Sequence, residues 1–220
     1  MITTIGYLFS SFGSELDMSE VLRCVMLQTR AIGILEAEDL YDNFMKEDFP
    51  EEELKPFSFL QDMIRNGQCR IFTFLDHHKL VGYAVLTADS SAEEAPSPSK
   101  AALLDYLAVR GNLRNHGIGS WVLRQLPELI SPLGHLLIEI EDPDYAETDA
   151  ERSNRNRRRH FYMKNNVQDT EARTKVNGMN YRILDLAAFA PVYNRSEAED
   201  AITRMYREVL PECWNEAEVH

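Results

Sequence analysis

The pattern of apolar and polar positions predicts that strands and helices alternate along the chain from about residue 25. Runs rich in β-branched and aromatic residues, or apolar at alternate positions, predict strands at 25–34, 68–75, 80–88, 101–109, 135–141, 167–173 and 179–186. Apolar residues three or four positions apart predict helices at 36–46, 57–67, about 117–130, 151–166 and 196–210. This order predicts a mixed α/β domain.

Some of these runs also predict how the strands connect. Residues 101–109, AALLDYLAV, are apolar at both alternating sets of positions, which is typical of a central strand covered on both faces. Residues 101–141 run as strand, loop, helix and strand, which predicts a parallel crossover. The tetrapeptide DHHK joins 68–75 to 80–88 and predicts a hairpin with His77 and His78 in a solvated turn.

Residues typical of loops and of helix ends divide the chain into segments. Residues 89–100, DSSAEEAPSPSK, predict a flexible loop. Helix stops are predicted at Asn66-Gly67 and at Asn166, and Ser196 is a candidate N-cap for the last helix. We expect an N-terminal extension over 1–24, a folded domain over 25–186 and a C-terminal helical extension over 187–220.

Composition narrows the class of protein. The chain has 220 residues, 44% of them hydrophobic and 27% charged, which suits one soluble domain with a substantial core. No apolar run is long enough to cross a membrane, and the first residues lack the basic region of a secretory signal, so we expect a cytoplasmic protein. The net charge is 23 − 36 = −13, which disfavours nucleic acid as a partner.

The cysteines and histidines give no sign of a metal or a disulfide framework. Cys24, Cys69 and Cys213 are far apart and form no C-x-x-C pair. The histidines show no ligand spacing such as H-E-x-x-H. We therefore predict no metal and interpret the thiols as buried or incidental.

The stretch RNHGIGSW, residues 114–121, is the strongest candidate for a binding site. It lies between a predicted buried strand and an amphipathic helix. The first turn of a helix has unpaired N–H groups and a partial positive charge, so it favours an anion. Gly117 and Gly119 would let a diphosphate approach the backbone, while Arg114 adds a charge and Ser120 a hydroxyl donor.

Two familiar phosphate loops do not fit this stretch. A Walker loop needs a lysine directly after its last glycine, and here Ser120 follows Gly119. A dinucleotide-binding fingerprint needs a third glycine, and that position is Val122.

The chain resembles the GNAT superfamily of N-acetyltransferases over roughly residues 25–186. RNHGIG fits the family's R/Q-x-x-G-x-G/A loop, DYLAV resembles its central strand, and HFYMKNNV resembles its tyrosine motif, with Tyr162 on the tyrosine. The resemblance implies a central mixed sheet flanked by helices and acetyl-CoA as co-substrate. It assigns contacts with the coenzyme to three parts of the chain. These are the end of the central strand, the glycine loop with the start of its helix, and one residue of a later helix: Leu107, Ala108 and Val109; Arg114, Asn115, His116, Gly117, Ile118, Gly119 and Ser120; and Asn154.

The chain departs from the family pattern at two places. The Gly-Phe that ends the tyrosine motif is replaced by Asn166-Val167. Many members also carry an asparagine seven residues before the tyrosine, where this chain has Arg155, with Asn154 one position away.

The resemblance also suggests the catalytic groups. Tyr162 would protonate the departing thiolate, and its alternative is a packed aromatic residue on a helix face. Glu139 and Glu141, two residues apart on one strand face, are candidates for the base that deprotonates the amine. They are alternatively a solvated strand face, or acids that attract a cationic acceptor.

The segment RSNRNRRRH, 152–160, is strongly basic within an acidic protein. It either reaches the coenzyme phosphates or forms a solvated helix face. On a helix, the arginines at 155, 157, 158 and 159 cannot all face one ligand.

Together these features predict an enzyme that transfers an acetyl group from acetyl-CoA to a primary amine by direct attack through a tetrahedral intermediate. The acceptor would be a small molecule or a protein, bound between the early helices, roughly 36–66, and the late strands. The alternatives are a non-catalytic acyl-CoA-binding domain, or an interaction protein that uses helix 196–210 as a homodimer or partner surface. Packing of that helix on its own domain is the favoured interpretation.

Overall fold

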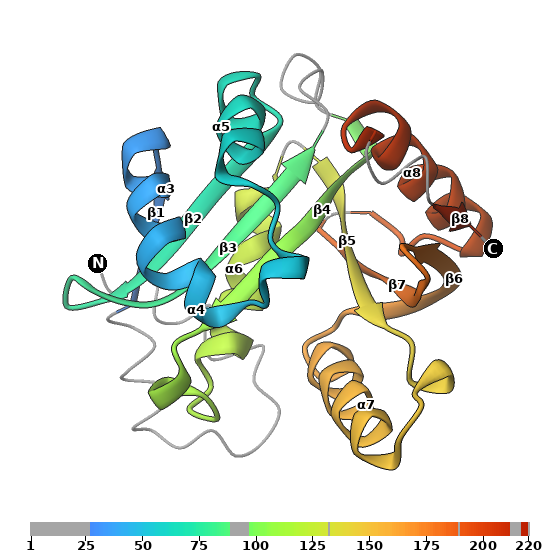
Figure 1. Cartoon of the computed structure of the whole chain (residues 1–220). Helices are drawn as coiled ribbons and strands as arrows, with labels where there is room; N and C mark the ends of the chain where they lie inside the picture. Colours follow the sequence, from blue (N-terminus) through green and yellow to red (C-terminus); the bar gives the residue numbers. More distant parts are fainter. Residues whose placement is uncertain (1–26, 89–96, 132, 189, 212–216, 220) are drawn as a thin grey trace, which may run out of the picture.

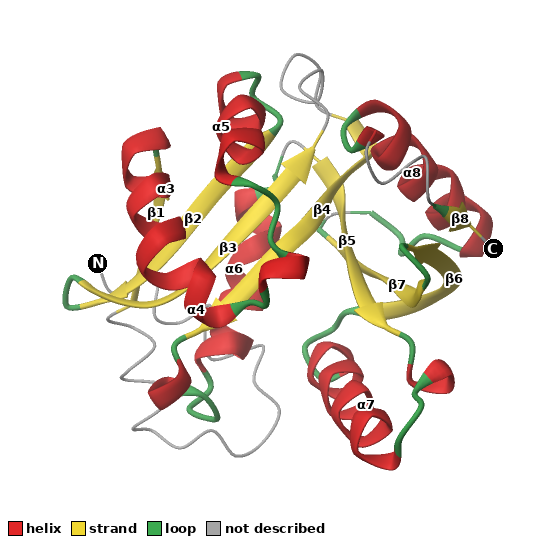
Figure 2. Ribbon diagram, in the orientation of Figure 1, coloured by secondary structure: helices red, strands yellow, loops and turns green. Residues whose placement is uncertain are grey.

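The structure is a computed structural model that describes residues 27–88, 97–131, 133–188, 190–211 and 217–219. The predicted extension 1–24, Cys24, Cys213 and most of the predicted loop 89–100 lie outside these residues. The described part confirms a mixed α/β fold in which helices flank one sheet (Figures 1 and 2).

The strands follow the predicted order, with one short addition at the end. They are β1 Leu27–Ile32, β2 Cys69–Asp76, β3 Lys79–Ala88, β4 Ser97–Val109, β5 Leu133–Glu141, β6 Gln168–Val176, β7 Met179–Ala187 and β8 Glu218–Val219. The α-helices are α3 Ile34–Leu40, α4 Lys46–Asp48, α5 Phe57–Arg65, α6 Ile118–Leu129, α7 Asp149–Met163 and α8 Arg195–Glu208. Shorter helical turns are η1 Tyr41–Met45, η2 Glu51–Glu53, η4 Gly111–Leu113 and η5 Pro143–Tyr145.

The described strands form one eight-stranded sheet in the order β1-β2-β3-β4-β5-β7-β6-β8. The β4–β5 pair is parallel, and α6 crosses between its two strands, which confirms the predicted crossover. The other neighbouring pairs are antiparallel. β4 therefore lies at the centre of the sheet, between β3 and β5.

Two apolar clusters cover the two faces of this sheet. One joins α6 and Tyr162 of α7 to the face of β5 that carries Leu136, Ile138 and Ile140. The other joins α3, α5 and α8 to the opposite face, which includes Leu137. Figure 1 shows α3, α5 and α8 in front of the sheet and α6 behind it. Burial on both faces accounts for the unbroken apolar character of β4.

Local sequence signals fix several boundaries. His77 and His78 form an exposed two-residue turn with φ of 45° and 67°, as hairpins of this length require. Asn166 has a φ of 65° after α7, the left-handed conformation predicted for that helix stop. Thr148 forms a capping box with Glu151 and begins α7 two residues earlier than predicted.

Other boundaries differ from the prediction. Residues 97–100 belong to β4 and not to a loop, because the start of this strand pairs with β5, Ser97 opposite Leu133. The N-cap of α8 is Asn194 and not Ser196, since Asn194 forms a capping box with Glu197. The helix predicted over 36–46 is divided by the π-helical turn η1, which apolar spacing does not distinguish from an α-turn.

Candidate active site

Strands β4 and β5 separate at the centre of the sheet, and this separation defines the candidate active site. Their parallel pairing extends as far as Leu103 opposite Leu137. Beyond it β4 continues to Val109 and β5 to Glu141, and Figure 2 shows the two strands diverging toward these ends. The last residues of β4 therefore have a strand partner on the β3 side only, opposite Gly82, Tyr83 and Ala84.

The backbone of β4 places two residues toward the gap. The Arg110 N–H donates to Val81 O of β3 at 3.0 Å. Because backbone polar groups of successive strand residues face opposite neighbours, Ala108 also faces β3, whereas Leu107 and Val109 face the gap. The gap is thus bordered by main-chain groups free of strand pairing, the kind of donor that the resemblance implies for residues 107–109.

A bulge and a glycine shape β4 before the gap. The β3–β4 register shifts between Val85 and Leu86, which leaves Asp105 as the extra residue on β4. A Cβ on Gly82 would lie 2.6 Å from the Ala108 carbonyl oxygen, so β3 can approach β4 this closely only with glycine at position 82.

The loop 114–117 lies at one side of this gap and leads into α6. Gly117 is the N-cap of α6 with a φ of 76°, and among the described residues no side chain caps the helix. Arg114, Asn115 and His116 are exposed, and the Arg114 Nε donates to the Val109 carbonyl at 3.1 Å. The uncapped amides of the first turn face outward beside a cation, an arrangement that fits the phosphates of acetyl-CoA.

Within α6 the loop residues have different roles. The Ile118 side chain is buried in the core, so its backbone N–H is the group available to a ligand. A Cβ on Gly119 would lie 3.0 Å from Cζ of Phe161. The absence of a side chain at Gly119 therefore makes room for an α7 ring, a packing role that we did not predict. Ser120 is half-buried in the first turn.

Tyr162 lies on the buried side of α7. Its ring belongs to the apolar cluster behind the sheet and meets Phe161 edge to face at a centroid distance of 5.2 Å. No hydrogen bond within the described part of the chain reaches its hydroxyl. Burial raises the pKa of Tyr162 to about 12, against a smaller opposing effect of Arg158.

Arg155 occupies the same helix face two turns earlier. Its Nη1 donates to the Asp142 carbonyl at 3.1 Å, and its Nε lies 3.5 Å from Oε2 of Glu141. Asn154, one position before it, is exposed. Of these two candidates, Arg155 is the one directed at the end of β5.

The two glutamates of β5 have different surroundings. Glu139 accepts hydrogen bonds from the Tyr206 hydroxyl and, at 2.9 Å, from Thr174 Oγ1. Burial raises its pKa, although both hydrogen bonds oppose the shift. Glu141 instead lies between Arg155 and Arg158, at 3.5 and 3.6 Å. Glu139 is therefore the carboxylate better suited to accept a proton.

An ion pair that we did not predict lies near Glu139. Lys55 Nζ contacts Asp105 Oδ1 at 2.8 Å, and Thr87 Oγ1 donates to Oδ2 of the same carboxylate at 2.6 Å. The Asp105 side chain is 5% exposed. Asp105 raises the pKa of Glu139 and Lys55 lowers it. A single acid within the apolar run AALLDYLAV was the available signal.

Cys69 of β2 interacts electrostatically with Asp105 and Lys55. Burial raises the pKa of this thiol to about 12, with Asp105 adding to the shift. A buried thiol with such a pKa is protonated and unreactive at neutral pH.

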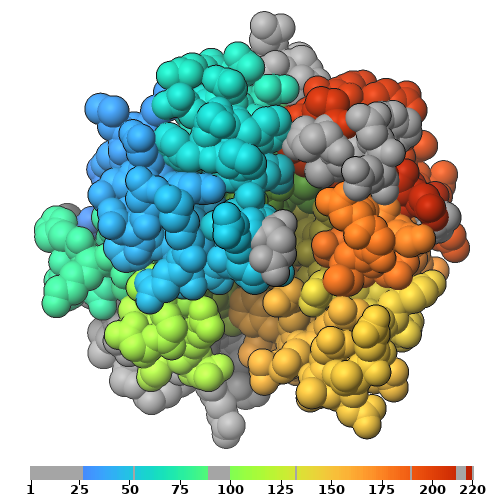
Figure 3. All heavy atoms as spheres, in the orientation of Figure 1, coloured from blue at the N-terminus to red at the C-terminus, as the bar shows by residue number. Residues whose placement is uncertain are grey.

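The predicted catalytic residues lie on opposite faces of the sheet. Tyr162 belongs to the cluster that contains α6, whereas Glu139 bonds Tyr206 of the cluster that contains α8. The β4–β5 gap is where the sheet is open between these faces. Figure 3 shows the front face hollowed between the cyan segment before α5, the light-green loop before α6 and the orange β6–β7 region.

The basic helix α7 forms ion pairs on the protein itself. Arg159 Nη2 contacts Asp169 Oδ2 at 3.0 Å, and Arg182 Nη1 contacts the same oxygen at 3.0 Å. Arg182 also bonds Asp142, and Arg173 Nε lies 2.8 Å from the other Asp142 oxygen. Arg159 of α7 is therefore paired within the protein, whereas Arg152 and Arg157 of the same helix are exposed.

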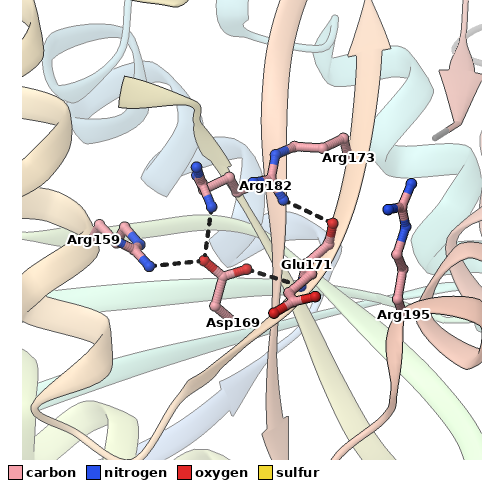
Figure 4. A pocket seen from close by; sticks show the side chains of 6 residues that line it. All are labelled: Arg159, Asp169, Glu171, Arg173, Arg182 and Arg195. Atoms are coloured by element: carbon pink, nitrogen blue, oxygen red, sulfur yellow. Dashed lines mark hydrogen bonds and ion pairs between the residues drawn. The ribbon is translucent and has the colours of Figure 1, made fainter. Parts of the chain in front are cut away.

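This network borders a cavity of about 480 Å³ (Figure 4). Figure 4 shows Asp169 between Arg159 and Arg182, and Arg173 turned toward the backbone of Glu171. Arg195, the remaining cation of the lining, contacts Glu199 at 2.7 Å. The four arginines of the lining thus already have carboxylate partners. Two of them, Arg159 and Arg182, share Asp169 and so join α7 to β6 and β7.

No described helix has the length and apolar character that a membrane span requires. Nor does the described part of the chain bring three or more His, Cys, Asp or Glu side chains together as a metal site.

Comparison with known proteins agrees with this geometry. Residues 34–134 match the model of the acetyltransferase (GNAT) family. No curated protein sequence matches the chain. Many solved structures do, at low sequence identity.

Three solved structures illustrate the likeness. A GNAT-family protein from Bacteroides thetaiotaomicron has a TM-score of 0.62 at 16% identity, covering 83% of this chain and 98% of its own. A spermidine N-acetyltransferase chimera from Vibrio cholerae and a human enzyme has 0.53 at 14%, covering 74% and 96%. NAA60 of Arabidopsis thaliana, solved with acetyl-CoA, has 0.51 at 12%, covering 74% and 99%. At these identities the likeness shows a shared fold.

Proposed function

We propose that this chain, which has the GNAT fold and whose residues 34–134 match the GNAT acetyltransferase family, transfers an acetyl group from acetyl-CoA to a primary amine. The observation that carries the proposal is the divergence of β4 and β5 beside the uncapped start of α6. A gap bordered by main-chain groups that have no partner strand, with an anion site at one side, suits a long thioester with a diphosphate. The acceptor is an amine of a small molecule or of a protein.

The donor would be held mainly by backbone groups. The N–H groups of Gly117, Ile118, Gly119 and Ser120 are candidates for the diphosphate, together with the Arg114 guanidinium. The main-chain groups of Leu107 and Val109, which face the gap, are candidates for the acyl oxygen and the pantetheine amides. Asn115, His116, Ala108 and Asn154 remain candidates from the resemblance.

Glu139 would act on the acceptor side of the gap. An amine enters as an ammonium ion and must lose one proton before its lone pair can attack the thioester carbon. Glu139 takes that proton, and its raised pKa makes it a stronger base than an exposed carboxylate. The neutral amine then adds to the thioester carbon and forms a tetrahedral intermediate. When this intermediate collapses, the C–S bond breaks, the nitrogen loses its second proton, and the departing sulfur takes up one proton, so that coenzyme A leaves as a thiol.

Tyr162 would act on the sulfur side. With a pKa of about 12 it is a weaker acid than a free thiol of pKa about 8.5, so complete proton transfer to a free thiolate is unfavourable. Its hydroxyl can instead donate a hydrogen bond while negative charge develops on the sulfur.

The alternative is a domain that binds acyl-CoA without catalysis. The placement of Arg155 favours it, because a position that carries asparagine in many members is here occupied by a cation paired with Glu141. The interaction-protein alternative has less support, since the apolar face of α8 packs on its own sheet and buries Ala198, Ile202 and Met205.

Two measurements test the proposal. Acetyl-CoA at about 100 times its Kd should stabilise the protein by about 2.7 kcal/mol and raise its melting temperature. Gly119→Glu should abolish that rise, because the new carboxylate crowds Phe161 and repels the phosphates. Gly33→Glu is the matched control: position 33 has open space and an extended backbone, so the rise should persist.

The second measurement is release of free thiol with a panel of amines. Turnover distinguishes an enzyme from a binding domain. No thermal shift at millimolar acetyl-CoA would overturn both coenzyme-dependent functions.

A further inference from the structure

The C-terminal helix α8 brings a tyrosine against the central strand β5. Tyr206 is 1% exposed, and its hydroxyl donates to Oε1 of Glu139. Thr174 Oγ1 of β6 donates to the same oxygen at 2.9 Å, and the two hydroxyl oxygens lie 3.5 Å apart. Two donors from different elements therefore converge on one carboxylate oxygen.

The other oxygen of Glu139 is differently placed. Among the described residues no hydrogen bond reaches Oε2. Glu139 is half-buried, and a carboxylate with one oxygen held and the other without a protein donor is restricted to one orientation but keeps a site for a proton. Glu139 and Tyr206 both lie outside the segment 34–134 that matches the family.

We propose that Tyr206 is a positioning residue for catalysis, holding Oε1 of Glu139 so that Oε2 receives the proton of the acceptor amine. This inference rests on the proposed acetyl transfer. In the step, Oε2 gains one proton and the carboxylate becomes a neutral acid, while the ammonium loses that proton and becomes a neutral amine. The Tyr206 hydroxyl keeps its own proton throughout.

The charged groups around Glu139 make the effect of Tyr206 measurable. Burial raises the pKa of Glu139, the hydrogen bonds of Tyr206 and Thr174 lower it, Asp105 of β4 raises it, and Lys55 lowers it. The Cys69 thiol of β2, beside Asp105 and Lys55, is protonated at neutral pH. Removing the Tyr206 donor leaves burial and Asp105 less opposed, so Glu139 should become harder to ionise.

The test is the pH dependence of kcat/KM for an amine in Tyr206→Phe. The acid limb of the kcat/KM profile should move to a pH about one unit higher. At pH values below this limb, kcat/KM should therefore be about tenfold lower than in the wild type. The melting-temperature rise caused by acetyl-CoA should be the same as in the wild type. An acid limb identical to that of the wild type overturns the proposal.

A matched control separates the hydroxyl from the packing. Tyr83 is as buried as Tyr206, and its hydroxyl donates to another carboxylate, Asp48, at 3.0 Å. Tyr83→Phe should leave the acid limb in place, and a limb that moves equally in this variant counts against the proposal. If Tyr206→Phe fails to fold, Thr174→Val removes the other donor and should move the limb in the same direction.

A direct titration keeps this inference separate from the proposed function. The side-chain carboxyl carbons of glutamate, labelled with ¹³C, report the ionisation of Glu139 by NMR, with Glu139→Gln used for assignment. The pKa of Glu139 should be higher in Tyr206→Phe than in the wild type, and an unchanged value overturns the positioning role. Failure of the proposed function appears elsewhere, as a wild type that neither gains stability from acetyl-CoA nor releases thiol.

Discussion

At the scale of single residues, Tyr162 and Glu139 obtain their properties from burial. Tyr162 lies among apolar side chains, and its hydroxyl has no hydrogen bond within the described residues. Glu139 is bonded by two hydroxyl groups, yet its pKa is still raised. Burial disfavours the ionised form of both side chains and raises both pKa values, a perturbation that is typical of functional sites.

Tyr162→Phe should reduce kcat by about tenfold to a hundredfold, because the hydrogen bond to the developing thiolate is lost. The free energy of unfolding should change little, since the hydroxyl has no protein partner to lose. Thiol-release kinetics with thermal melting of both proteins checks this. Equal rates in the two proteins would remove Tyr162 from its proposed role.

Glu139→Gln should reduce kcat/KM for the amine by about 10² to 10⁴, because the amide cannot take a proton. Its oxygen can still accept from Tyr206 and Thr174, so the fold should persist. Glu141→Gln is the internal comparison. Since Glu141 is paired with Arg155 and Arg158, this variant should lose less than about tenfold. The reverse ranking would assign the base to Glu141.

At the scale of elements, the sequence predicted those parts of the site that depend on local pattern. The apolar strand that became β4, the glycine loop and the amphipathic α6 are adjacent in sequence, so periodicity and turn chemistry predict them. Asp105 with Lys55, and Glu139 with Tyr206, are joined across 50 and 67 residues. Contacts between distant elements depend on sheet order and register, which no local pattern contains.

The packing role of Gly119 shows the same limit. Its position in the loop was predicted, but the ring that occupies the space above it belongs to Phe161 on another helix. The arginines of α7 are a second case: their carboxylate partners, Glu141 and Asp169, lie on β5 and β6. One helix read alone therefore suggested a phosphate site or a solvated face.

The ion pairs between α7, β6 and β7 give a prediction about stability. Burial by itself raises the pKa of Asp169. The Glu171 N–H, Arg182 and Arg159 together lower it by more, so the pKa of Asp169 is below its ordinary value. Asp169→Asn should lower the free energy of unfolding by about 2 kcal/mol at neutral pH. Denaturant melts of the two proteins measure this difference.

The pH dependence of that difference follows from its sign. A carboxyl with a lowered pKa in the folded state stabilises the fold above the unfolded pKa of about 3.9, and this contribution is lost as the pH falls through the folded value. The difference in the free energy of unfolding between the wild type and Asp169→Asn should therefore be largest near pH 7 and shrink in strong acid. A difference that grows as the pH falls would contradict the lowered pKa of Asp169.

At the scale of the whole molecule, the net charge of −13 would act with opposite sign on the two substrates that we propose, acetyl-CoA and an amine. Acetyl-CoA carries phosphates and is repelled at long range, with the exposed Arg114 as a local exception at the loop. An ammonium ion is attracted. The acidic character of the chain therefore favours cationic acceptors before any specific contact is made.

Ionic strength separates these two effects within one experiment. Raising it from about 0.01 M to about 0.15 M shortens the screening length from about 30 Å to about 8 Å. The KM for a cationic amine should then rise, because attraction is screened, while the KM for acetyl-CoA should fall, because repulsion is screened. Initial rates with each substrate varied in turn measure both constants, and each is the control for the other. A shift of both constants in the same direction would show that local contacts, and not the net charge, govern the encounter with both substrates.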